Sequence, residues 1–89
     1  MKLKKDFVLR EVAGSFIVLA VGKDTLDFDG MLSLNESGAL LWRTLEKEAD
    51  KDMLIEALMQ EYEVEREEAS ADVEVFLDKL SAAGCLEIF

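Results

Sequence analysis

The spacing of apolar positions changes once along the chain, near residue 34. Before this point, short apolar runs are broken by Gly and Asp, a pattern typical of β-strands. After it, apolar residues recur at helical spacing to within five residues of the C-terminus. The first part predicts strands over residues 7–12, 16–21 and 26–34, with connections short enough for an antiparallel meander. The unbroken apolar run over 16–21 is typical of a middle strand that is covered on both faces.

The second part of the chain predicts three helices. Asn35 and Asp50 can cap the first two, because their side-chain oxygens can accept a hydrogen bond from the first helical turn. Gly84 suits the left-handed position that ends the third helix, and the tail after it could add a last extended segment. The expected helices span residues 36–46, 51–62 and 65–83.

These elements together predict an α+β fold, in which a three-stranded antiparallel sheet is followed by a three-helix bundle. Eighty-nine residues are enough for one domain with its own core, so residues 1–89 are expected to form a single domain. Trp42 falls two turns into the first helix as a core anchor. The third helix carries a core stripe at helical spacing, which consists of Ala69, Val73, Phe76, Leu77 and Leu80.

The amino-acid composition argues against most kinds of catalytic and metal-binding site. The chain has no His and only Cys85, so it lacks the residues for a Cys/His zinc site or a Ser-His or Cys-His nucleophile. Asp27 and Asp29 alternate with apolar residues, and a solvated strand face or protection of a sheet edge explains them better than acid–base chemistry. No catalytic residue, metal ligand or cofactor is therefore expected, and the order of elements favours a binding module.

Charge is distributed unevenly between the two parts of the chain. The net charge of −10 lies entirely in residues 35–89, which hold five basic and fifteen acidic side chains. Nucleic-acid binding depends on Lys and Arg that neutralise phosphates, so we expect no nucleic-acid partner. An acidic, solvated helical face is the simplest explanation of the excess charge.

A short uncharged run, residues 13–22, follows the basic residues Lys2, Lys4 and Lys5. It is well below the roughly 20 residues that a membrane-spanning helix needs. A signal peptide is also disfavoured, because charged residues separate the basic start from the apolar run. A central strand explains this run better, and we expect a cytoplasmic protein without a membrane partner.

Residues 34–42, LNESGALLW, resemble the LN-x-x-G-A-x-x-W signature of the PqqD-like family, whose name refers to coenzyme PQQ synthesis protein D. Residues 62–64 and 72–84 resemble the C-terminal half of the same family, so that the resemblance covers about residues 5–87. It implies a winged-helix-like domain, the recognition element for precursors of ribosomally synthesised and post-translationally modified peptides (RiPPs). Such domains bind the leader segment of a precursor peptide and present it to a modifying enzyme, such as a radical SAM enzyme or a lasso-peptide protease. The form of the motif with Trp42 is closer to general and lasso-associated members than to the pyrroloquinoline quinone pathway protein.

The resemblance also implies where the peptide binds. The leader adds as a strand to the third strand and lies in the groove against the third helix. The residues alone already leave an open strand edge there, and they place one apolar residue, Val75, on an otherwise charged shoulder of the helix. An isolated exposed valine is common and needs no functional explanation, so Val75 could also be an ordinary surface residue. The implied peptide-binding residues are Leu26, Asp27, Phe28, Asp29, Gly30, Met31, Leu32, Asp72, Val75, Phe76 and Lys79.

Two alternatives from other classes of protein remain. Winged-helix folds commonly bind DNA, but residues 65–83 hold six acidic side chains against two basic ones. The second alternative is a structural or regulatory subunit that acts through protein–protein contacts, its third-strand edge docking on a partner or on a second copy as a homodimer.

Overall fold

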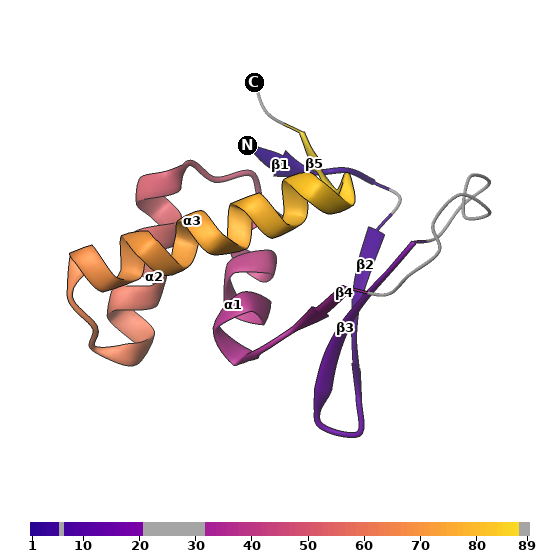
Figure 1. The fold of residues 1–89 in the computed structure, drawn as a ribbon, viewed down its shortest axis with the longest axis horizontal. Coiled ribbons are helices and arrows are strands. Elements are labelled where there is room, and N and C mark those ends of the chain that lie inside the picture. The colour runs from indigo at the N-terminus through magenta and orange to yellow at the C-terminus, as the bar shows by residue number, and fades with distance from the viewer. Residues whose placement is uncertain (6, 21–31, 88–89) are drawn as a thin grey trace.

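The chain folds as an antiparallel sheet followed by three helices (Figure 1). The structure is a computed structural model that describes residues 1–5, 7–20 and 32–87. The longest helix, α3, crosses over α1 and α2, and the hairpin of the first two strands of the sheet projects away from the helices (Figure 1). The elements are β2 (Phe7–Val12), β3 (Ser15–Ala20), β4 (Leu32–Leu34), α1 (Glu36–Leu45), α2 (Lys51–Tyr62) and α3 (Arg66–Ala83).

The sheet is the expected meander, with β3 between β2 and β4. Residues 26–31 of the third predicted strand lie outside the described residues, and β4 is the part that the structure describes. Val18 of β3 is fully buried in the core, whereas Ile17 and Leu19, on the opposite face of the strand, are half-buried. The expectation that both faces of this strand are covered is thus met on one face only.

The β2–β3 hairpin turns through Ala13 and Gly14, which both have positive φ, 51° and 81°. Positive φ at both central residues is the requirement of a type I′ turn, whose twist matches that of the flanking strands. Gly14 adopts this conformation without strain, but the Cβ of Ala13 is crowded there. The hairpin therefore contains one strained residue at its tip.

Capping residues fix the ends of the helices. Asp50 accepts a hydrogen bond from the Met53 N–H at 2.8 Å and caps α2, as Asn35 caps α1. Gly84 ends α3 with φ 75°, as the sequence predicts. The N–H of Gly84 bonds to Ser81 O and that of Cys85 to Leu80 O, which is the Schellman arrangement.

The core lies where the three helices meet one face of the sheet. Trp42 is 1% exposed, and Leu80 and Val18 are fully buried, so residues from α1, α3 and β3 share one cluster. Burial of each large apolar side chain contributes about 1.5–3 kcal/mol, so this cluster holds the helices together. Arg43 of α1 adds a contact with the sheet, since its guanidinium carbon lies 5.7 Å from the centre of the Phe16 ring.

A second, two-stranded sheet joins the two ends of the chain. β1 (Lys2–Leu3) pairs antiparallel with β5 (Leu86–Glu87), and Lys2 Nζ lies 3.8 Å from a carboxylate oxygen of Glu87. Ala49 N–H donates to Met1 O at 3.0 Å, which ties the N-terminus to the α1–α2 connection as well. β5 is the extended tail that the sequence predicts. β1 was missed, because two residues carry no periodic signal.

We expect Ala13→Asn to stabilise the protein, because Asn tolerates the left-handed region and Asn-Gly is a favoured type I′ pair. The gain should be about 0.5–1 kcal/mol, which is about half of the roughly 1–2 kcal/mol of strain that an L-residue with a Cβ carries there. Urea unfolding of the two proteins measures the difference, with Ser15→Asn as the control for adding an amide beside the turn. A loss of stability in Ala13→Asn would show that the turn is not type I′.

Candidate functional site

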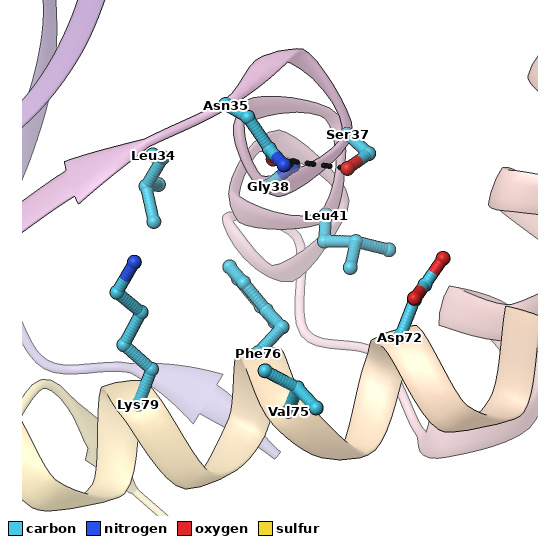
Figure 2. A pocket seen from close by; sticks show the side chains of 9 residues that line it. All are labelled: Leu34, Asn35, Ser37, Gly38, Leu41, Asp72, Val75, Phe76 and Lys79. Atoms are coloured by element: carbon cyan, nitrogen blue, oxygen red, sulfur yellow. Dashed lines mark hydrogen bonds between the residues drawn. The ribbon is translucent and has the colours of Figure 1, made fainter.

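One face of α3 forms the floor of a groove. Asp72, Val75, Phe76 and Lys79 lie along this face at spacings of three, one and three residues. Phe76 points from α3 toward α1 and is 6% exposed, so it belongs to both the core and the groove (Figure 2). Val75 is 68% exposed, the highest value among the exposed large apolar residues of the described chain. The floor is thus apolar in the middle, with an acidic and a basic side chain at its two ends.

The opposite wall of the groove is the junction where β4 passes into α1. The groove encloses about 310 Å³ between this junction and α3. Leu34 is 8% exposed and Leu41 2% exposed, so the wall presents the edges of core residues rather than loose side chains. The groove is lined from the junction by Leu34, Asn35, Ser37, Gly38 and Leu41 and from α3 by Asp72, Val75, Phe76 and Lys79.

The junction is shaped by the side chain of Asn35. Its Oδ1 accepts hydrogen bonds from Gly38 N–H at 2.8 Å and from Ser37 Oγ at 2.9 Å (Figure 2). A Cβ on Gly38 would lie 3.2 Å from Asn35 Oδ1 and 3.2 Å from Leu34 Cβ. Glycine is therefore favoured at position 38 because the capping amide folds back closely over the first helical turn.

The pairing register shows which way β4 directs its backbone groups. Val12 and Ser15 flank the two-residue turn and form a hydrogen-bonded pair, and such pairs alternate along antiparallel strands. Carried across β3, this alternation makes Leu34 and Leu32 the residues that bond to Phe16 and Val18. The N–H and C=O of Ser33 therefore point away from β3, toward the outer side of β4.

Lys79 already contacts this outer side. Its Nζ donates a hydrogen bond to Ser33 O at 3.0 Å, which joins α3 to β4 across the groove. In Figure 2 the Lys79 side chain rises from α3 toward the strand beside Leu34. The outer edge of β4 and the face of α3 thus form two sides of one site.

A second cavity of about 420 Å³ continues from the acidic end of the groove. Asn35, Ser37 and Asp72 line both cavities. Tyr62, the last residue of α2, and Val64, from the α2–α3 connection, close the second. Partial burial, followed by the negative charges of Glu36 and Glu61, raises the pKa of the Tyr62 phenol above its ordinary value. Tyr62 thus stays a neutral hydrogen-bond donor at physiological pH.

The structure brings together part of the site that the resemblance implies. Asp72, Val75, Phe76 and Lys79 line one groove, whereas Leu32 lies on β4, half-buried, and does not line it. Residues 26–31 lie outside the described residues. Sequence reasoning missed the junction residues as part of the site, although they belong to the LNESGALLW motif. That these residues bind a peptide stays a prediction.

The described part of the chain offers no other chemical centre. Within residues 1–5, 7–20 and 32–87, no group of three or more Cys, Asp or Glu side chains could hold a metal ion. No helix described by the structure is long and apolar enough to cross a membrane. Burial raises the pKa of the Cys85 thiol, and nearby Lys4 opposes this shift only in part, so the thiol remains protonated within the core.

The three-stranded antiparallel sheet followed by three helices, with a groove between an outer strand and α3, defines a winged-helix-like α+β domain. The sequence model of the family described as coenzyme PQQ synthesis protein D (PqqD) matches residues 9–86, and the chain belongs to this family. The resemblance carried by residues 34–42 is therefore confirmed.

Two solved structures have a similar fold. One is TbiB1 in complex with the TbiA(beta) leader peptide, with a TM-score of 0.79, 24% identity, and cover of 100% of this chain and 98% of that chain. The other is lasso peptide synthetase B1 complexed with the leader peptide, with a TM-score of 0.74, 21% identity, and cover of 94% and 93%. Comparison with curated proteins gave no match. The similarity of the two structures supports the winged-helix-like fold.

We expect Asn35→Ala to lower the free energy of unfolding by about 1 kcal/mol, because it removes the N-cap of α1. Asn35→Asp is the matched control, since its carboxylate can accept the same bond from Gly38 N–H and should retain most of the stability. Urea unfolding measures both variants. Equal losses in the two would show that the capping bond is not what stabilises the junction.

Proposed function

We propose that this protein binds the leader segment of a ribosomally synthesised precursor peptide and presents it to a modifying enzyme. The leader adds in extended form to the outer edge of β4 and lies in the groove against α3. The observation that carries this proposal is the outward-facing backbone of Ser33 beside a groove with an apolar centre. Membership of the PqqD family and the leader peptides in the two similar structures support it.

The groove has the two features that strand addition uses. An edge backbone group supplies main-chain hydrogen bonds, and the cavity beside it receives alternate side chains of the added strand. Val75 gives the cavity an exposed apolar surface, and Phe76 provides a rigid base beneath it. We also assign residues 26–32, which precede Ser33 in the strand predicted from the sequence, to the edge to which the peptide adds.

The size of the groove sets the expected affinity. Two or three apolar side chains of the peptide can enter it, and each contributes at most about 1.5–3 kcal/mol before ordering costs. With main-chain pairing added, a dissociation constant near 1 μM, or about −8 kcal/mol, is within reach. The protein therefore needs no large interface to hold a leader.

In this proposal the protein itself is not an enzyme, and the chemistry belongs to its partner. The partner is a peptide-modifying enzyme of the kind that works with recognition elements, such as a radical SAM enzyme or a lasso-peptide protease. The LNESGALLW motif favours a lasso-type or other RiPP pathway over pyrroloquinoline quinone synthesis. A reducing cytoplasm suits the unpaired, buried Cys85.

The direct test is a titration of the ¹⁵N-labelled protein with the unmodified precursor peptide encoded in the same gene neighbourhood. We expect the largest amide shifts at Ser33 and along Asp72–Lys79. Shifts confined to α2, with none at Ser33 or on α3, would contradict the groove assignment.

We expect Val75→Glu to weaken binding of the precursor at least about tenfold, because the new charge is solvated in the free protein but loses water in the complex. Stability should change by less than about 0.5 kcal/mol, since the side chain is exposed on a helix. Met53→Glu is the matched control: Met53 is 50% exposed on α2, outside the groove, and the variant adds the same charge. Calorimetric titration measures both, and equal losses would exclude a local role for Val75.

DNA binding provides a test against the alternative function of winged-helix proteins. We expect no measurable binding to duplex DNA at physiological salt, because the helical part carries fifteen acidic side chains against five basic ones. Fluorescence anisotropy with a labelled duplex at low and physiological salt measures this. Micromolar binding that weakens steeply with salt would favour a regulator over a peptide-binding protein.

A further inference from the structure

The Lys79–Ser33 hydrogen bond occupies the position that strand addition requires. Ser33 O faces the outer side of β4, and Lys79 Nζ donates to it at 3.0 Å. An incoming strand would donate one of its own N–H groups to this carbonyl. The free protein thus has a side-chain donor where the complex needs a main-chain donor.

The contact is easily displaced. Lys79 and Ser33 are both exposed, and an exposed bond from a flexible ammonium contributes little, because water and chain entropy offset it. Lysine on an edge strand or beside it also discourages pairing with other chains. The bond therefore keeps weakly binding chains from pairing with the β4 edge, whereas a tightly binding peptide can displace it.

In the part of the chain that the structure describes, the Lys79 ammonium forms no ion pair. The ammonium remains at one end of the groove, while Asp72 lies seven residues earlier, at the other end. Seven helical residues span about 10.5 Å, which is about three residues of an extended strand. A bound peptide therefore meets a positive site at one end and a negative site at the other.

We propose that Lys79 acts as a gate, by which we mean a side chain that covers the β4 edge in the free protein and recognises an acidic residue of the peptide in the complex. In the free protein Lys79 closes the β4 edge by bonding to Ser33 O; in the complex it pairs with an Asp or Glu of the added strand. The groove then selects peptides that carry a carboxylate at the Lys79 end and none at the Asp72 end. This inference rests on the proposed function and adds the charge order of the ligand.

The test uses a library of random peptides of about 12 residues, long enough to span the groove in extended form. The library is selected separately on the wild-type protein, on Lys79→Met and on Lys47→Met. Lys47 is exposed past the C-terminal end of α1 and lines neither cavity, so its variant matches the loss of charge. We expect wild type and Lys47→Met to enrich Asp or Glu at one position relative to the apolar anchors, and Lys79→Met to lose this enrichment.

Affinities of one selected peptide sharpen the result. Lys79→Met should bind the acidic peptide about three- to fivefold more weakly than wild type, the range of an exposed ion pair. The same peptide with its acidic residue changed to the amide should bind Lys79→Met at least as tightly as wild type, because the edge is no longer occupied. Circular dichroism melting of each variant checks that the fold is retained.

Two results would overturn the gate while leaving peptide binding intact. One is selection of peptides without an acidic position by the wild-type protein; the other is the same acidic preference in Lys79→Met. If the precursor peptide fails to bind and no library peptide is enriched on wild type, the proposed function itself fails.

Discussion

The capping bond of Asn35 is the interaction on which the site depends. It turns the chain from β4 into α1 within one residue, because Asn35 Oδ1 satisfies the Gly38 N–H that would otherwise lack a partner. The turn holds Leu34 and Leu41 against the core and sets their edges opposite α3. A groove between a strand and a helix needs both elements to leave their junction in fixed directions, and this single side chain provides that constraint.

The glycine at position 38 follows from the same constraint. A glycine inside a helix costs about 1 kcal/mol relative to alanine. Here the absent Cβ leaves room for the amide of Asn35 and the side chain of Leu34, each 3.2 Å from where a Cβ would lie. The signature LNESGALLW therefore has a structural explanation that is independent of any ligand. Leu34, Leu41, Asn35 and Gly38 of this motif form one wall of the groove, and Trp42 anchors that wall in the core.

The side chains at the ends of the groove are more exposed to solvent than those at its centre. Phe76 and Leu41 are held by core packing, so the apolar centre exists before any ligand arrives. Lys79 and Asp72 are exposed, so core packing does not fix their side chains. Preformed apolar contacts lower the ordering cost of binding, whereas mobile charged side chains can adjust to the ligand. The central cavity is suited to affinity, and the charged ends are suited to discrimination between peptides.

The amino-acid sequence by itself determined the local features of this protein. Apolar spacing located the three helices, Asn35, Asp50 and Gly84 marked helix ends, and the unusual exposure of Val75 was visible from its place on the helical face. These features depend on residues within a few turns of one another. The LNESGALLW motif identified the family, but it did not show that its own residues form a wall of the groove.

Tertiary structure decided the features that join distant residues. The β1–β5 pair connects the two ends of the chain, and two-residue strands have no period to detect. The outward direction of Ser33 follows from a register that is fixed by the type I′ turn and carried across β3. Lys79 reaches Ser33 across 46 positions of sequence. Such contacts depend on how the elements pack, and packing is set by the whole core rather than by any local pattern.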